Sequence, residues 1–233
     1  AITSLLKILP RAQYVGYTAT PFANVFVDPD DAIDLFPKDF IISLPRPTGY
    51  MGVDSFYDLG VLDFGPTDRR SNHAAFVRDV RGSDQHDNNL RRAVDSFVLA
   101  GALKLWRASQ RPELAKRYRH HTMLVHQSAF IDEHEDTAKL VQKIVDDGGY
   151  FDGSGFARIE RLWEEDFKEV CAVRANGLPV PSSFRSIRKF LTECLVKCQR
   201  PEDPERHVRI VNGDKLDDTP DFDRAPVWSI IVG

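Results

Sequence analysis

The apolar residues of this 233-residue chain fall into short stretches with two kinds of spacing, helical and strand-like. Helical spacing predicts a helix over residues 1–9 and a longer helix over residues 90–107. Asn88 or Asn89 can cap the longer helix, and Pro112 can open a further short one.

Four apolar runs have the length and composition of short buried strands: residues 12–17, 122–127, 208–211 and 227–232. A helix follows the second run and ends at the Gly148–Gly149 pair. Residues 151–199 are mainly helical in pattern, with a turn at residues 176–181. This order of strands and helices predicts α/β layering around a largely parallel sheet.

Residues 28–89 differ from the rest because they are dense in Pro, Gly and Asp. They contain only brief extended pieces, such as residues 40–44. Such a stretch predicts a long and mostly irregular connector that crosses a surface.

Composition and charge limit the classes of protein that need to be considered. The chain is 42% hydrophobic and 28% charged, with a net charge of −4, so no global basic excess marks a nucleic-acid-binding module. A local basic patch can still coexist with an acidic total. No apolar run reaches the roughly 18 residues of a membrane span. The three cysteines lack the spacing of a disulfide framework or metal site, which predicts buried thiols and a cytoplasmic protein.

The stretch YVGYTATPFAN places Thr18, Thr20 and Pro21 directly after an apolar run. Thr18-Ala19-Thr20 resembles the Ser/Thr-Ala-Thr motif of superfamily II helicases. Further segments follow in order, namely GYTATPFANVFVDP, DLFPKDFIISLPRPTGYMG, MLVHQSAFID and a final IIVG. Together they resemble the Z-one domain family, whose members are classed as candidate endonucleases linked to a superfamily II helicase core.

The resemblance implies an α/β fold of the RecA-like (P-loop NTPase-like) kind, with a three-layer sheet and a helical insertion. It also implies that the chain is part of a larger helicase-like protein. In the corresponding division, the end of the first lobe is residues 1–28, a connector is residues 29–89 and a helical segment is residues 90–119. Part of the second lobe is residues 120–233, with a helical insertion at about 150–206.

The resemblance further implies the middle part of an ATP-dependent helicase or translocase that acts on DNA in a bacterial restriction-modification or phage-defence system. Thr18 and Thr20 would couple nucleotide state to the nucleic-acid strand, whereas ATP and Mg²⁺ would bind outside this stretch. The expected partners are DNA and the nuclease or ATPase subunits of such a system. Two alternatives stay open: the hydroxyls bond only to local backbone, or the chain is a non-catalytic α/β module that docks a partner nuclease or ATPase subunit.

Two acids are the nuclease candidates, because metal-dependent cleavage needs carboxylates that converge on a divalent ion. Asp166 has Asp-x-Lys spacing with Lys168, and Asp214 follows a predicted strand. The simpler interpretations are a solvated helix face for Asp166 and a polar turn for Asp214. No metal site is predicted.

The nucleic-acid-binding candidates are four basic residues near the short helix: Arg111, Lys116, Arg117 and Arg119. Arginine and lysine neutralise phosphates, which makes contact with a DNA backbone one interpretation of this run. A solvated charged face is the other.

Overall fold

The computed structural model describes residues 2–9, 11–20, 26, 39–58, 64–79, 86–127, 130–212 and 219–233. The chain divides into two units, Ala1–Gly52 and Val53–Gly233. The first contains the predicted N-terminal helix as α1 (Ile2–Ile8), whereas residues 12–17 form no strand and are exposed. The strand predicted there is wrong. An apolar extended run becomes a strand when neighbours pair with it and bury it, and these residues are not buried.

The second unit begins with two short elements, η1 (Val53–Ser55) and α3 (Asn72–Phe76), within the predicted connector. Ser71 caps α3, because its Oγ accepts a hydrogen bond from the Ala74 backbone N–H at 3.1 Å. Asp58 accepts hydrogen bonds from Ser71 Oγ and the Asn72 N–H, and the Ser71 bond is the main cause of its lowered pKa. Local capping by polar side chains therefore forms a helix that the composition of this stretch does not predict.

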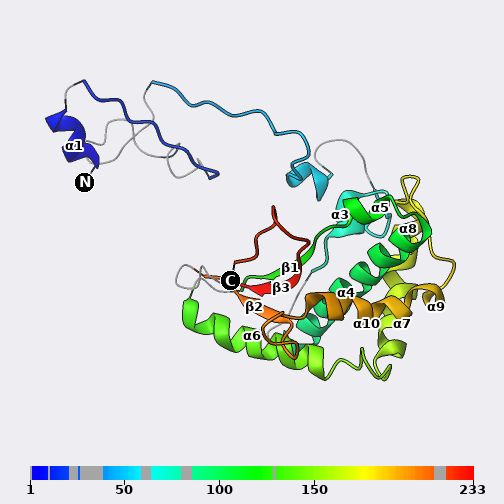
Figure 1. The fold of residues 1–233 in the computed structure, drawn as a ribbon. Coiled ribbons are helices and arrows are strands. Elements are labelled where there is room, and N and C mark those ends of the chain that lie inside the picture. The colour runs from blue at the N-terminus through cyan, green and yellow to red at the C-terminus, as the bar shows by residue number, and fades with distance from the viewer. Residues whose placement is uncertain are drawn as a thin grey trace. The chain divides into compact units, whose positions relative to one another are not determined.

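Helices make up most of the second unit (Figure 1). The predicted helices are confirmed as α4 (His86–Gln110), α5 (Leu114–Arg117) and α6 (Ile131–Asp146). The mainly helical pattern of residues 151–199 is also confirmed. It forms α7 (Phe156–Leu162), the π-helical η3 (Trp163–Phe167), α8 (Lys168–Val173), α9 (Phe184–Ile187) and α10 (Lys189–Cys198).

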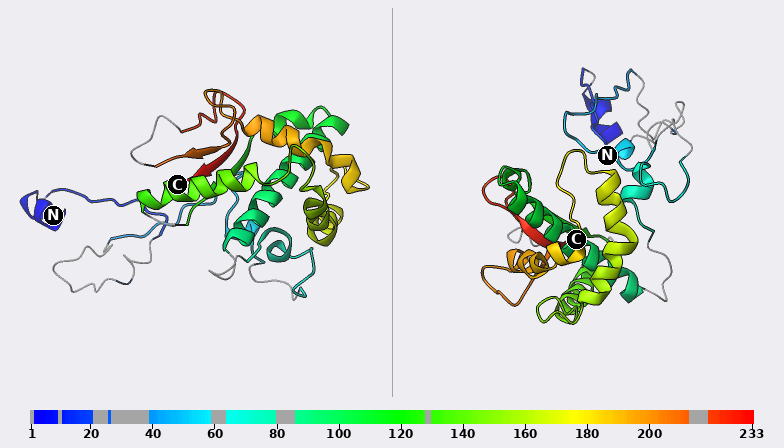
Figure 2. Two further views of the ribbon diagram at one scale, coloured as in Figure 1. Left: turned by 90° about the horizontal axis from the view of Figure 1, so that it is seen from below. Right: turned by 90° about the vertical axis from the view of Figure 1, so that its right-hand side faces the viewer.

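Three predicted strands form one parallel sheet in the order β1-β3-β2: β1 (His121–Val125), β2 (Val208–Ile210) and β3 (Trp228–Val232). His121 pairs with Trp228 and Val208 pairs with Ile230, which sets the register on both sides of β3. Helix α6 runs beside this sheet (Figure 2).

The hydrophobic core lies on one face of the sheet. That face carries Val125, Val208, Ile230 and Val232, which belong to a single buried cluster with residues of α4, α6 and α10. The opposite face carries Thr122 and Leu124 on β1, Arg209 on β2, and Ser229 and Ile231 on β3, and none of them joins that cluster.

The three-layer RecA-like fold is therefore wrong for the described residues. Such a sheet needs apolar side chains on both faces for helices to cover. Here Leu124 is 66% exposed on the second face, where Thr122 and Arg209 are polar and Ile231 is the one buried apolar residue of the described strands. The structure is instead mostly helical, with a small three-stranded parallel sheet.

Helix α4 contacts α10 and β1 closely at Gly101. A Cβ atom at this position would lie 2.3 Å from Cys194 Sγ and 2.8 Å from ring atoms of His121. Only glycine leaves room for this approach. Cys194, Cys171 and Cys198 are free and buried, as predicted. None of the described helices is long and apolar enough to cross a membrane.

Candidate nucleic-acid interface

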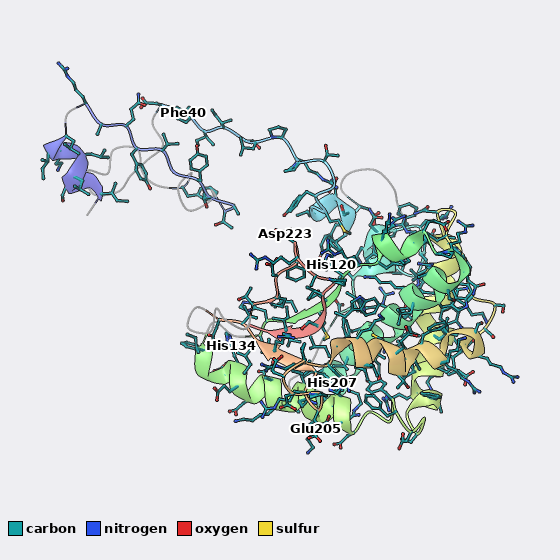
Figure 3. All side chains as sticks on the ribbon, viewed as in Figure 1. Phe40, His120, His134, Glu205, His207 and Asp223 are labelled. Atoms are coloured by element: carbon teal, nitrogen blue, oxygen red, sulfur yellow. The ribbon has the colours of Figure 1, made fainter. Side chains whose placement is uncertain are left out.

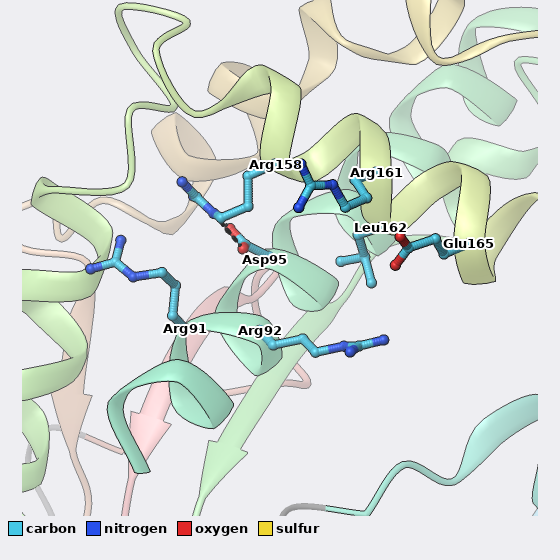
Figure 4. Close-up of a pocket in the computed structure, with 7 residues that line it drawn as sticks. All are labelled: Arg91, Arg92, Asp95, Arg158, Arg161, Leu162 and Glu165. Atoms are coloured by element: carbon cyan, nitrogen blue, oxygen red, sulfur yellow. Dashed lines mark hydrogen bonds and ion pairs between the residues drawn. The ribbon is translucent and has the colours of Figure 1, made fainter. Parts of the chain in front are cut away.

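A hollow of about 190 Å³ lies between the first half of α4 and the segment α7–η3. We call it the arginine pocket, because four of its seven lining residues are arginines (Figure 4). The lining residues are Arg91, Arg92, Asp95, Arg158, Arg161, Leu162 and Glu165.

The two helices present arginines here because their other sides are buried. In α4, Val94 and Val98 are fully buried in the core, which leaves Arg92 exposed and Arg91 half-buried. In α7, Ile159 is fully buried, whereas Arg161 is exposed. Amphipathic packing of both helices therefore brings arginines from distant parts of the sequence to one hollow.

A glycine-rich turn connects α6 to α7 and determines where α7 begins. Gly149 has a φ of +67°, a conformation that favours glycine, and a Cβ on Gly155 would lie 2.0 Å from the Gly148 carbonyl oxygen. The Gly155 N–H donates to the Gly149 carbonyl at 3.1 Å. This tight turn sets the position of Arg158 in the first turn of α7.

Asp95 and Arg158 form an ion pair in the lining of the pocket. Arg158 donates from Nε to Asp95 Oδ2 at 2.8 Å and from Nη2 to Asp95 Oδ1 at 2.9 Å. Tyr150 OH donates to Asp95 Oδ1 at 2.7 Å, and Arg158 Nη2 also donates to the Gly148 carbonyl. Burial is the main cause of a raised pKa of Tyr150, so its hydroxyl stays protonated and donates. The hydrogen bond to Asp95 is the main cause of the raised pKa of Arg158.

The other three arginines are not neutralised in this way. The side chains of Arg91, Arg92 and Arg161 form no hydrogen bond or ion pair with any residue that the structure describes. Glu165, the remaining charged residue of the lining, has no such partner either. The pocket thus keeps an excess of positive charge, which suits it to an anion.

The four predicted nucleic-acid-binding residues lie in two kinds of surroundings. Arg111 donates to the Gly177 carbonyl and Arg119 to the Asp223 carbonyl, each at 2.9 Å. Lys116 and Arg117 are exposed at the end of α5 and have no partner within the described ranges. Lys116 and Arg117 are therefore the pair more available to a phosphate.

Thr18 and Thr20 are both exposed in the first unit. The Thr20 N–H donates to Thr18 Oγ1 at 3.0 Å, so this hydroxyl bonds to local backbone. This bond agrees with the interpretation that the hydroxyls bond only to local backbone. Residues 12–17 before it are not a strand. A coupling role for these residues stays a prediction.

Asp166 is buried, with 5% of its surface exposed, and not on a solvated helix face. Arg78 Nε donates to its Oδ2 at 2.7 Å, and Arg69 Nη2 lies 3.4 Å from its Oδ1. Lys168 instead pairs with Glu164 at 2.7 Å, so the Asp-x-Lys spacing does not bring these two side chains together. Asp214 lies outside the described residues, and no group of three or more acids, histidines or cysteines within those residues could hold a metal ion.

Two buried histidines have structural partners. His121 Nε2 donates to the Phe97 carbonyl at 2.8 Å, and burial is the main cause of its pKa being lowered to about 4. His207 lies near Glu205 beside α6 (Figure 3). There its backbone N–H donates to Gln142 Oε1 at 2.9 Å, and burial lowers the pKa of its ring.

The arginine pocket was not predicted from the sequence. Arg91 and Arg92 precede Arg158 and Arg161 by more than sixty residues, and both pairs alternate with apolar positions of ordinary amphipathic helices. The available signal was the repeated placement of arginine on the polar sides of two helices that pack together.

The described residues form a mostly helical domain with a small parallel sheet, and the lining of its arginine pocket has an excess of positive charge. Residues 89–233, more than half of the chain, match the Z1 domain. The chain belongs to the Z1 domain family, as the sequence resemblance implied. No curated protein and no solved structure matches the chain.

Proposed function

We propose that this Z1 domain binds the phosphate backbone of DNA. In this proposal it is the DNA-contacting part of an ATP-dependent superfamily II helicase- or translocase-like protein of a bacterial restriction-modification or phage-defence system. The observation that carries the DNA contact is the arginine pocket, with three of its four arginines unpaired among the described residues. The wider setting rests on the resemblance of the TATP and IIVG segments.

The chemistry of arginine supports a phosphate ligand. A guanidinium group presents a planar fork of donors that matches phosphate oxygens, and it stays charged at every physiological pH. The net charge of −4 does not oppose this contact, because binding responds to the local field of a patch.

The size of the pocket favours phosphate groups over a whole nucleotide. Pockets that enclose a nucleotide-sized ligand measure about 300–1,000 Å³, whereas this one measures about 190 Å³. Of its two acids, Asp95 is already bonded to Arg158 and Tyr150, which leaves it poorly suited to hold Mg²⁺. ATP and Mg²⁺ therefore belong to our proposal for the whole protein and not to this pocket.

The test is binding of the chain to labelled single-stranded and duplex DNA, measured by fluorescence anisotropy over a range of salt concentrations. We expect the variant Arg91→Gln/Arg92→Gln/Arg161→Gln to bind more weakly and with a smaller salt dependence. The control changes the net charge equally with three exposed arginines outside the pocket, Arg70, Arg206 and Arg224. Equal losses in both variants would remove the pocket from the proposal.

One observation favours a second candidate function, a non-catalytic module that docks a nuclease or ATPase subunit. The sheet face that carries Leu124 leaves this side chain 66% exposed, although Ser229 and Ile231 on the same face are already buried within the chain. A partner that covers this face would bury Leu124. The discriminating variant is Leu124→Lys, which should abolish co-purification with a subunit of the same system and leave DNA binding unchanged.

A further inference from the structure

We propose that the arginine pocket takes the terminal phosphate monoester of a nucleic-acid strand, in preference to an internal phosphodiester. This inference rests on the proposed function, because it assumes that the pocket meets nucleic acid. It names the chemical group that the pocket selects.

The first argument is charge. Asp95 neutralises Arg158, which leaves the cations of Arg91, Arg92 and Arg161 and the single anion of Glu165. The described lining therefore has a surplus of two positive charges. A phosphate monoester carries about −1.5 to −2 at pH 7, whereas each internal phosphodiester carries −1. The monoester matches this surplus more closely.

The second argument is shape. The pocket is a small hollow between two helices, with a volume of about 190 Å³. An internal phosphodiester brings two flanking nucleotides to this open hollow, whereas a terminal phosphate brings one. A terminal phosphate enters end-on with three acceptor oxygens, and Figure 4 shows Arg158 and Arg161 next to each other, whereas Arg91 and Arg92 extend in opposite directions.

The third argument is preorganisation. Arg158 uses Nε and Nη2 to bind Asp95 and the Gly148 carbonyl, and its Nη1 takes part in neither contact. Tyr150 holds the same carboxylate from a fully buried position. Arg158 is thus held in one conformation before a ligand arrives, which lowers the entropy lost on binding. Asp95 and Tyr150 act as positioning residues in this arrangement.

The experiment compares one short single-stranded oligonucleotide in three forms, with a 5′-phosphate, with a 3′-phosphate, or with hydroxyl groups at both ends. We expect at least one phosphorylated form to bind the chain about tenfold more tightly than the hydroxyl form. The two phosphorylated arms identify which end is bound. The preference should fall as the pH drops below about 6, where the monoester takes up its second proton.

The same three oligonucleotides are then bound to Arg161→Gln and to the control Arg206→Gln, an exposed arginine outside the pocket. We expect the preference to be lost in the first variant and kept in the second. Both residues are on the surface, so equal melting temperatures should show that folding is intact.

Three results would overturn the inference. Equal binding of all three forms, with losses on Arg161→Gln, would refute the terminal-phosphate preference and leave the proposed function standing. A preference that survives in Arg161→Gln would place the terminal phosphate elsewhere on the chain. No binding of any oligonucleotide would refute the inference and the proposed function together.

Discussion

Arg78 and Asp166, 88 residues apart in the chain, form a two-pronged ion pair in which Nε donates to Oδ2 at 2.7 Å and Nη2 donates to Oδ1. Arg78 follows α3, and Asp166 lies in the π-helical η3. Arg69 approaches the same carboxylate at 3.4 Å. A single buried acid therefore ties the segment around α3 to the helices of the second unit.

Replacing Asp166 with Asn should lower the free energy of unfolding by about 3 kcal/mol. The substitution removes the buried negative charge that pairs with Arg78 and Arg69, and leaves both arginines without it. Urea unfolding measures the change. The matched control is Glu164→Gln, which breaks a half-exposed pair with Lys168 and should cost less than about 1 kcal/mol. Equal losses in both variants would contradict the structural role of Asp166.

Gly101→Ala should destabilise the second unit by about 1–3 kcal/mol, because the added Cβ would lie 2.3 Å from Cys194 Sγ. Thermal unfolding measures the effect. In the background Cys194→Ala the same substitution should cost less, since the sulfur is gone. Gly65→Ala is the control, because its Cβ would meet nothing within 4 Å. A Gly101→Ala variant as stable as this control would disprove the close contact.

The stability of the second unit should fall as the pH is lowered from 7 to 5. His121 has a pKa of about 4 in the folded state, below the value near 6.5 of an unfolded chain. Between these two pKa values the unfolded state binds more protons than the folded state. The free energy of unfolding therefore decreases as the pH is lowered, by about 2 kcal/mol between pH 7 and pH 5.

The variant His121→Gln tests this cause, because it removes the titrating ring. Its pH dependence should be shallower than that of the unsubstituted chain, with a remainder from His207, whose pKa burial also lowers. An unaltered slope in His121→Gln would assign the pH dependence to other groups.

Lys116→Gln/Arg117→Gln should reduce the salt dependence of DNA binding, by about 0.9 in the logarithmic slope for each phosphate contact that is lost. Both side chains lack a partner among the described residues. The comparison variant Arg111→Gln/Arg119→Gln removes the same charge, but these side chains are bonded to backbone carbonyls, so its effect should be smaller. The reverse order would identify Arg111 and Arg119 as the contacts.

Thr18→Val/Thr20→Val in the whole protein should leave folding unchanged, because both residues are exposed. If these hydroxyls couple nucleotide state to DNA, DNA-stimulated ATP turnover should fall while binding of ATP is kept. Turnover equal to that of the unsubstituted protein would leave Thr18 with only its local bond to the Thr20 N–H.

The sequence by itself determined the elements whose pattern is local. The long helix α4 and strands β1 and β3 were predicted because apolar spacing along a few turns or a few strand residues reflects which side is buried. The ordered segments of the Z-one resemblance likewise identified the family that residues 89–233 match.

Tertiary structure decided what depends on residues far apart in the chain. Nothing near residues 12–17 in the sequence reveals that they stay exposed, and nothing near Leu124 reveals that its side chain is 66% exposed on the sheet. The Arg158–Asp95 pair spans 63 residues and the Arg78–Asp166 pair spans 88. A charge with a distant partner has the same local pattern as a solvated one, so only packing of the helices could place Asp166 in the interior and gather the arginines into a pocket.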